Sequence, residues 1–523
     1  MEALLQVVVL VTIAVLGTAL ARRLGLLAPI VLVVAGLALS YVHGFGQIRL
    51  DPRLVLVGIL PPLLYVAAVR TSVPAFRFNL RPILLLAVGL VVFTAVAVGL
   101  AVHALLPSVP LAICIALGAV VAPPDAVSAT AVARRIRLPR RVVTILEGES
   151  LINDATALVL LRVAVASAAG SAVGFTDVAG EVVVAAGGGL LVGAVGAVVI
   201  GFLHRRIDEP LLDNSLSLLT PFLLTFLTEQ IHGSAVVAVV VAGLSLGHRL
   251  PVLMSAASRL QMDAFWRIVR FLLEGLVFLL VGLHLREIID ELETPLGTVA
   301  AVTAAVLATL VVTRFCWVFA AAYLVRLIPR VRRRDPLPPP QFPAIIAFAG
   351  MRGVVTLAAA LALPLKLGGG REYPRALFVW VAFAVIVVTL VAQGATLPVV
   401  ARLLRLPADD PTADVLAEAA VLQQAGRAAR DRLDATADSA PPGVVERLRQ
   451  LVDQRTNTAW ERLGGDDRET PSQAYARLRQ EMIDAERDVI RAARDEGRIP
   501  EEVLVRAYRD LDLEESLLRR RSK

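Results

Sequence analysis

The sequence predicts an all-α polytopic membrane protein with about thirteen transmembrane helices, followed by a helical soluble tail. Of its 523 residues, 57% are hydrophobic and 19% are charged, and the mean hydropathy is +0.72. This composition excludes a soluble enzyme, a disordered chain and a fibrous protein. Apolar stretches of about 20 residues, the length of a helix that crosses the hydrocarbon core, recur along the chain. Aromatic residues make up only 5% of the chain, so a nucleic-acid partner is not expected.

The net charge changes sign near Arg405, which divides the chain into two predicted domains. Residues 1–405 contain 32 of the 52 Lys and Arg residues and 20 of the 45 Asp and Glu residues, and residues 406–523 contain the remaining 20 and 25. We expect a transmembrane domain over 1–405 and a cytoplasmic tail over 406–523, with amphipathic helices at 415–433 and 473–494. The apolar stripes of the tail are interpreted as helix-pairing surfaces, and regulation is one role open to it.

Thirteen apolar segments fit spanning helices, with a margin of about one because the shorter segments also fit re-entrant pieces. The first segment has no basic residue before it, which favours a retained helix over a cleaved signal peptide. In chain order the segments are 3–21, 28–43, 54–69, 83–105, 110–133, 142–168, 178–203, 216–231, 233–247, 271–285, 296–325, 344–365 and 378–400.

The basic residues of the predicted loops fall unequally on the two sides of the membrane. With thirteen spans, one side receives 23 of them, including Arg81, Arg141 and Arg326, and the other side receives six. The positive-inside rule makes the first side cytoplasmic. We therefore expect a multi-pass protein of the cell (plasma) membrane, with its N-terminus outside and its C-terminal tail in the cytoplasm.

Ten charged residues lie inside the predicted spans. A charge within the bilayer is costly and persists where it is paired or faces a water-filled cavity, so the functional site is expected among these residues. The basic residues are Arg162, Arg314 and Arg352, and the acids are Asp125, Glu147, Glu149, Asp154, Glu181, Glu229 and Glu274.

Two spans are predicted to be interrupted in mid-membrane. In the span 110–133, two consecutive prolines before Asp125 remove backbone donors and disrupt the helix. In the span 344–365, the run Gly-Met-Arg-Gly at 350–353 is a second interruption, at similar depth and in the opposite direction. Interrupted helices of opposite orientation are typical of inverted-repeat transporters, whose substrate site lies between the breaks. A glycine-rich packing face is the alternative for 350–353, but it leaves Arg352 without a role.

The span 142–168 carries polar residues on one face. Glu147, Ser150 and Asp154 share this face, and Asn153 is one residue round. At 1.5 Å per residue, Asp154 comes to a depth similar to that of Asp125 on the preceding span. We expect Glu147 and Glu149 to form a cytoplasmic funnel toward Asp154. Alternatively, these two glutamates complement the dipole at the helix N-terminus.

Glu274 and Arg314, both in the inner halves of their spans, are predicted to form a structural ion pair rather than an ion site. Cys114 and Cys316 lie far apart in apolar runs, so neither a disulfide framework nor a thiolate metal cluster is predicted. No cofactor is expected.

A mid-membrane aspartate reached by water can hold either a proton or a metal cation. Hard oxygen ligands suit Na⁺, Li⁺ or K⁺, and the predicted donors are Asp154, Asp125, Ser150 and Asn153, with backbone carbonyls freed at 122–124. Competition of proton and cation for one carboxylate, with alternating access to the two sides, amounts to antiport.

The run Leu-Glu-Gly-Glu-Ser-Leu-Ile-Asn-Asp at 146–154 resembles the Asn-Asp motif of the sodium/proton exchanger branch of the monovalent cation:proton antiporters. Asp125 is similar to that family's unwound-helix aspartate, and 350–353 to its late Arg-Gly motif. Leu-Pro-Pro-Leu-Leu at 60–64 and Gln-Gly-Ala-Thr-Leu-Pro at 393–398 also fit. The likeness covers about 1–405.

This resemblance implies a thirteen-helix fold that works as a homodimer by elevator-like movement, with one-for-one electroneutral exchange. It also implies that Asp154 binds the ion and the proton and that Asn153 fixes it or stands in for a second acid. Arg352, an intramembrane charge at the second interruption, is expected to belong to the transport site. Two departures from the family pattern stand out. Pro-Asp-Ala at 124–126 lacks the threonine of the frequent Thr-Asp-Pro, and Tyr-Val at 65–66 replaces a frequent acid, which leaves Glu274 as the expected partner of Arg314.

Three other functions compete with Na⁺/H⁺ antiport. A K⁺/H⁺ antiporter uses the same chemistry. A channel-like cation efflux system requires a pore ring or two adjacent aspartates, where this chain has Asn153 and Asp154. An intramembrane aspartyl protease requires an acid/base dyad in a Gly-x-Gly-Asp context, which Asp154 lacks. The sequence therefore favours a transporter over an enzyme.

Overall fold

The computed structural model of the chain confirms the all-α class: the described residues form helices and no strands. The structure describes residues 2–521 apart from 43, 46–50, 126–128, 131, 134–135, 137, 170–174, 336, 368–369, 407–408, 438–439, 442 and 462–468. The chain divides into two compact units, Met1–Ala408 and Asp409–Lys523.

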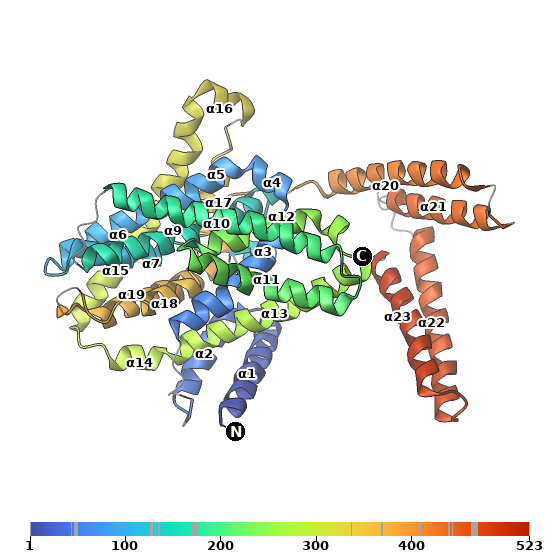
Figure 1. Ribbon diagram of the computed structural model, residues 1–523, viewed down its shortest axis with the longest axis horizontal. Coiled ribbons are helices and arrows are strands. Elements are labelled where there is room, and N and C mark those ends of the chain that lie inside the picture. Colours follow the sequence, from blue (N-terminus) through green and yellow to red (C-terminus); the bar gives the residue numbers. More distant parts are fainter. Residues whose placement is uncertain are drawn as a thin grey trace. The chain divides into compact units, whose positions relative to one another are not determined.

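The first unit consists mostly of apolar helices (Figure 1). Its N-terminal half contains α1 (Glu2–Leu24), α2 (Ala28–Ser40), η1 (Leu54–Ile59), α3 (Leu60–Arg70), α4 (Val73–Phe78), α5 (Leu80–Leu84), η2 (Leu85–Leu90), α6 (Val91–Leu105), α7 (Leu111–Val121), α9 (Arg140–Ala168) and α10 (Phe175–His204). Its C-terminal half contains α11 (Pro210–Gln230), α12 (Ala235–Leu253), α13 (Ala256–Leu283), α14 (Leu285–Asp290), α15 (Leu296–Tyr323), η3 (Leu324–Leu327), α16 (Pro329–Arg334), α17 (Gln341–Phe348), α18 (Val354–Leu361) and α19 (Arg375–Leu403).

Among the described residues, nine helices are long and apolar enough to cross a membrane. Three shorter apolar helical segments, 28–40, 54–70 and 111–121, accompany them. The membrane-protein class is thereby confirmed, and the count of thirteen spans stays a prediction.

The span predicted at 271–285 begins too late, because α13 begins at Ala256. Its first half is amphipathic: Met262 and Trp266 are buried, whereas the charged side chains of Asp263 and Arg267 are exposed. A search for continuous apolar sequence misses such a stretch, although its helical period is visible. The Ser255 hydroxyl, which accepts a hydrogen bond from the backbone N–H of Ser258, caps the start of the helix.

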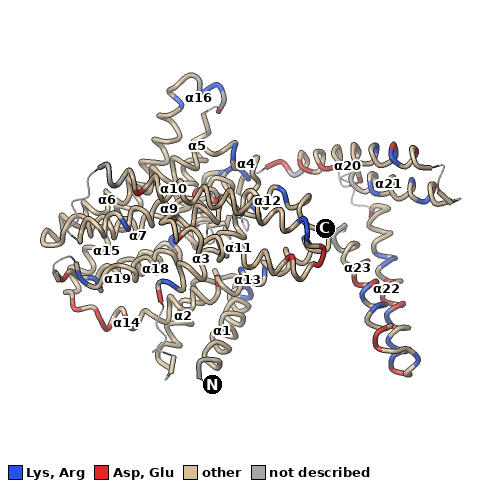
Figure 2. The backbone as a smooth tube through the Cα atoms, in the orientation of Figure 1, with Lys and Arg blue, Asp and Glu red and all other residues tan. Residues whose placement is uncertain are grey.

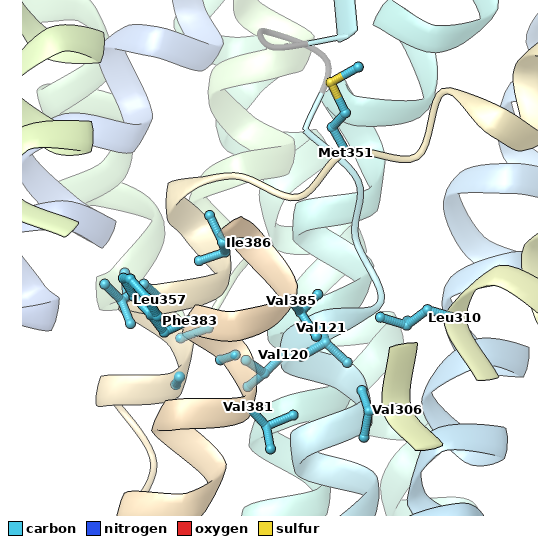
Figure 3. Close-up of a cluster of buried hydrophobic side chains, with 14 of the residues drawn as sticks. Val120, Val121, Val306, Leu310, Met351, Leu357, Val381, Phe383, Val385 and Ile386 are labelled. Atoms are coloured by element: carbon cyan, nitrogen blue, oxygen red, sulfur yellow. The ribbon is translucent and has the colours of Figure 1, made fainter. Parts of the chain in front are cut away.

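Two apolar cores fill the first unit, and α9 contributes to both of them. One core includes Leu146 and Leu161 of α9 with residues of α7, α15, α18 and α19. The other includes Leu151 and Ala155 of α9 with residues of α3, α12 and α13. Figure 3 shows part of the first core, where valines of α7, α15 and α19 surround the point at which α7 ends. The polar residues of α9 therefore lie on the helix that both cores share.

The second unit contains two helical hairpins of different composition from the membrane unit, since Figure 2 shows charges along all four of their helices. Helix α20 (Pro411–Asp434) packs on α21 (Val444–Glu461), and α22 (Pro471–Asp495) packs on α23 (Glu501–Arg521). A capping box of Thr470 and Gln473 starts α22. Ile483, Leu511 and Leu518 form the small apolar core of the second hairpin. The helices predicted at 415–433 and 473–494 lie within α20 and α22.

Candidate functional site

Two interrupted helices meet at the backbone level. Helix α7 ends at Val121 and its chain continues without helical structure to Asp125. Helices α17 and α18 flank a second non-helical run, 349–353. The Asp125 N–H donates a hydrogen bond of 2.7 Å to the carbonyl of Met351, which joins the two interruptions. Both predicted breaks are therefore present and in contact, and residues 126–128 lie outside the described residues.

Arg352 holds these interruptions together rather than lining an open site. Its side chain is buried, and its Nε donates to the carbonyl of Val121 at 3.1 Å. Its Nη2 donates to the carbonyl of Ala122 at 3.4 Å, and its backbone N–H donates to Thr389 Oγ1 at 3.0 Å. A cation at the C-terminal end of α7 also complements the dipole of that half-helix. The guanidinium thus satisfies carbonyls that the broken helix leaves without intrahelical partners.

Gly353 leaves the space that Asp125 occupies. A Cβ atom at Gly353 would lie 2.6 Å from both Cβ and Cγ of Asp125. Carbon atoms do not approach so closely, so any side chain at 353 would displace the aspartate. The glycine of the Arg-Gly pair is therefore required by the position of Asp125.

Asn153 connects α9 to the break of α7. Its side chain is fully buried, and Nδ2 donates a hydrogen bond of 2.8 Å to the carbonyl of Pro124. Its Oδ1 atom is buried and has no hydrogen-bond partner among the described residues. An acceptor in this state is costly unless a ligand or water completes it, and such atoms are therefore informative about function. Asp154, the next residue, is also buried.

Asp154 and Asp125 line one cavity of about 130 Å³. At about 30 Å³ per water molecule, this volume holds a few waters or a partly hydrated ion. Polar groups concentrate on its wall: Asp125, Thr130, Glu147, Ser150, Asp154 and Glu274, with Arg70, Thr71 and Arg270. Five residues singled out from the sequence, Asp125, Glu147, Ser150, Asp154 and Glu274, therefore line a single cavity, and Asn153 directly precedes Asp154 on α9.

The cavity also contains residues that the sequence analysis did not select. Thr130 is buried and lines the cavity only five residues after Asp125. Arg270 lines it from α13 and bonds Glu274 at 2.5 Å. Thr130 lies five residues after Asp125, outside the Thr-Asp-Pro pattern, so the family motif does not point to it.

The predicted ion pair of Glu274 with Arg314 is wrong. Arg314 on α15 instead makes a bidentate pair with Glu149 on α9, at 2.7 and 3.0 Å, and also donates to the carbonyl of Ile346. Glu274 bonds Arg270, its neighbour one helical turn away. Arg314 is directed toward α9 and α17, so the acid it reaches lies on α9 rather than on α13.

This pairing also corrects the predicted funnel. Glu149 is 1% exposed and its carboxylate is engaged by Arg314, so it does not line an approach from water. Glu147, two residues earlier, does line the cavity. Residues two apart on a helix point in different directions, which separates the two glutamates into a structural and a cavity-facing position.

Comparison with known proteins shows which family shares the helices that carry this site. The family model described as "Sodium/hydrogen exchanger, transmembrane" matches residues 10–403. An uncharacterized Na⁺/H⁺ exchanger of Mycobacterium tuberculosis is 37% identical over 98% of this chain and 95% of its own length. A sodium, potassium, lithium and rubidium/H⁺ antiporter of Bacillus subtilis is 29% identical over 98% of this chain and 78% of its own.

Solved structures show the same fold. The sodium proton antiporter MjNhaP1 of Methanocaldococcus jannaschii, at pH 8, superimposes with a TM-score of 0.63 and 17% identity. The match covers 77% of this chain and 99% of that chain. At this identity the likeness concerns the arrangement of the helices.

Proposed function

The chain belongs to the sodium/hydrogen exchanger family, and from this premise we propose that Na⁺, K⁺ or Li⁺ and H⁺ compete for one carboxylate, that of Asp154. Membership makes the protein a membrane-embedded cation/proton antiporter rather than an enzyme. The proposal adds the residue, the choice of ions and the stoichiometry. The observation that carries it is the cavity that Asp154, Asp125 and Ser150 line together.

The oxygen atoms around this cavity fit a small hard cation. Carboxylates of Asp154 and Asp125 and hydroxyls of Ser150 and Thr130 face the same space. The buried Oδ1 of Asn153, which accepts no hydrogen bond from the described residues, is a further oxygen ligand next to Asp154 in the chain. Alkali cations prefer such oxygen ligands, and a protonated carboxyl cannot serve as an anionic ligand, so cation and proton exclude each other.

Asn153 would make the exchange depend on the broken helix. Since its amide N–H holds the carbonyl of Pro124, α9 and the interruption of α7 are expected to move as one body with the bound ion. Arg352 ties the second interruption to the same point through Val121. Elevator-like movement of this body would expose Asp154 to each side in turn.

The choice of cation follows from the same donors. Thr130 supplies a hydroxyl near Asp125, which compensates for the absence of a threonine directly before it. The Bacillus subtilis relative is named for four alkali cations, which supports a broad selectivity. We propose Na⁺ as the principal ion, with K⁺ and Li⁺ as alternatives to be ranked by a cation panel.

The test is a transport assay in proteoliposomes with an internal acid load and a pH-sensitive dye. Addition of Na⁺, K⁺ or Li⁺ should restore the fluorescence for the wild type and leave Asp154→Asn without response. Asp290→Asn is the matched control, because this aspartate is exposed and does not line the cavity, and it should behave as the wild type. An Asp154→Asn protein that still exchanges would refute the assignment.

Stoichiometry is tested by repeating the assay with and without a potential clamp. We propose electroneutral one-for-one exchange, since one carboxylate carries either one proton or one monovalent cation. Under this proposal the initial rate is the same at a clamped potential of zero and at an imposed negative potential. A rate that changes several-fold with potential would require a second charge in the cycle.

We also propose that the protein is a homodimer of the plasma membrane, with its N-terminus outside and a cytoplasmic, regulatory tail. The resemblance to the family and the distribution of basic residues support this arrangement. The tail supplies one more argument. Exposed apolar residues repeat with heptad spacing on α22, at Tyr475, Leu478, Met482, Ala485, Val489 and Ala492, and such a stripe pairs with a second helix. Cross-linking in membranes tests the dimer, and proteolysis of the tail in sealed right-side-out vesicles, which should leave it intact, tests the orientation.

A further inference from the structure

Three arginines converge on one aspartate outside the transport cavity. Asp335 accepts hydrogen bonds from Arg141 Nη2 at 2.8 Å, Arg81 Nη2 at 2.9 Å and Arg326 Nη2 at 2.5 Å. The arginines come from α9, α5 and η3, and Asp335 follows α16. Figure 2 shows further basic residues around α4 and α16. The cluster has three positive charges for one negative charge, an excess of +2.

The aspartate stays ionised, so the excess stays at +2. Burial alone raises the pKa of the Asp335 carboxyl, but the hydrogen bond and charge of Arg141, with the charges of Arg326 and Arg81, more than offset burial and lower the pKa. The carboxylate also orients the guanidinium groups in advance. Arg81 and Arg141 remain about one-third exposed, at 36% and 35%, and Arg141 Nε also donates to Asn79 Oδ1 at 3.2 Å. A guanidinium has more N–H donors than these contacts use.

An apolar cavity adjoins the cluster. Its volume is about 60 Å³. Small-molecule sites measure about 300 to 1,000 Å³, so this one accommodates a short run of methylene groups rather than a compact soluble ligand. Besides the three arginines, its lining is apolar, with Leu85, Ile145, Val318, Ala321 and Phe342 among the residues. Leu84 and Leu324 nearby are exposed on a helix and a turn at the end of membrane spans.

We propose that this place binds an anionic phospholipid of the cytoplasmic leaflet, with the phosphate on Arg81 and Arg141 and part of an acyl chain in the apolar cavity. Net positive charge beside an apolar slot at the end of membrane spans complements an acidic head group joined to a hydrocarbon chain. Basic pockets between helices on the cytoplasmic side recognise such head groups in membrane proteins generally. Arginine also forms the bidentate, charge-assisted hydrogen bonds that suit phosphate.

A lipid here would act on the helices that carry the transport site. It would bridge α5, α9, α15 and α17, whose side chains line the slot. Arg141 lies on the helix of Asp154, and Arg326 directly follows the helix of Arg314. Binding would thus stabilise one packing of α9 against α15 and α17, and the lipid composition of the inner leaflet would influence the exchanger.

The experiment measures lipid binding to the full-length protein in neutral detergent by thermal unfolding and native mass spectrometry. Phosphatidylglycerol should raise the melting temperature by several degrees, whereas phosphatidylcholine and inorganic phosphate should not. Arg81→Gln/Arg141→Gln should weaken phosphatidylglycerol binding about 30-fold, since each basic residue near an anionic surface contributes about a fivefold factor. Ala321→Leu, which fills the slot and keeps every charge, should weaken it as well.

The matched control is Arg332→Gln/Arg333→Gln, which removes the same charge from exposed arginines of α16 outside the slot. This variant should bind within about twofold of the wild type. Equal stabilisation by phosphatidylcholine, equal stabilisation by inorganic phosphate, or an equal loss in the control would each overturn the proposal. Should the Arg81/Arg141 variant fail to fold, undiminished binding by Ala321→Leu would overturn it as well.

Discussion

Two ion pairs with the same chemistry differ in what surrounds them. In the first unit, the membrane unit, Arg314 donates to both carboxylate oxygens of Glu149 at 2.7 and 3.0 Å, and the two side chains are 2% and 1% exposed. In the tail, Arg479 donates to both carboxylate oxygens of Glu514 at 2.7 and 2.8 Å, and the two side chains are 18% and 40% exposed. The distances are alike, so the environment alone distinguishes the pairs.

The two pairs show where in the chain the structure depends on individual charges. Loss of one partner inside the membrane unit leaves an unpaired charge that water cannot solvate, so α9, α15 and α17 are restricted to arrangements that keep the pair closed. In the tail, water and neighbouring charges replace a lost partner, and Arg479 already has a second acid, Glu486, at 2.7 Å. The membrane unit therefore depends on a few specific charges, and the tail on many exchangeable ones.

The largest expected effect is on the buried pair. Arg314→Leu leaves Glu149 unpaired and should destabilise the protein by about 3 to 5 kcal/mol, measured as thermal unfolding in detergent. The double variant Glu149→Leu/Arg314→Leu removes both charges and should regain most of this loss. A single variant that melts with the wild type, or a double variant worse than the single, would contradict the assigned pairing.

Next comes the contact between the two interruptions. Gly353→Ala places a Cβ 2.6 Å from Asp125 and should reduce transport at least tenfold while the protein still folds. Gly187→Ala, in a helix with nothing within 4 Å of the added atom, is the matched control and should transport normally. Initial transport rates are measured with the dye assay. Equal rates in the two variants would show that transport does not require Asp125 at this position.

The smallest effect concerns the tail. The hydrogen bond from Arg479 lowers the pKa of Glu514, against the rise that burial causes. A folded pKa below the unfolded value of about 4.3 means that the pair stabilises the hairpin above that pH and is lost as the pH falls through the folded pKa. Hydrogen exchange of 471–521, corrected for intrinsic rates, should increase only in that acidic range.

Glu514→Gln should reduce this acid sensitivity, while Asp512 and Glu515 keep their pairs with Arg487. It should change the melting temperature of the whole protein by no more than a few degrees. The comparable exposed pair of Arg477 and Glu469 serves as the control. Removal of this pair should leave the pH dependence of hydrogen exchange in α23 unchanged. A large loss of stability from Glu514→Gln would mean that the tail, too, depends on specific charges.

Much of the site follows from local sequence. Two consecutive prolines predict the end of α7, the glycines around Arg352 predict the second interruption, and helical spacing predicts that Ser150 and Asp154 face one space. These are properties of single segments, because backbone donors and side-chain directions are determined within a few residues. The family resemblance, which the comparisons confirm, rests on the same segments.

The predictions that were wrong or incomplete depended on packing between distant segments. The sequence predicts Glu147 and Glu149 together as a funnel, because nothing in their own segment shows that α15 brings Arg314 to the second of them. The start of α13 was missed because its first turns are amphipathic rather than continuously apolar. The hydrogen bond of Asn153 to the carbonyl of Pro124 joins residues 29 apart, so neither segment alone predicts it.

The most direct test of the central claim, that cation and proton share Asp154, is the Na⁺ concentration for half-maximal exchange as a function of pH. Competition at one carboxylate predicts that this concentration rises about tenfold for each unit of falling pH in the acidic range, while the maximal rate stays constant. Half-saturation at the same Na⁺ concentration across that range would contradict the claim, because cation and proton would then bind at separate places.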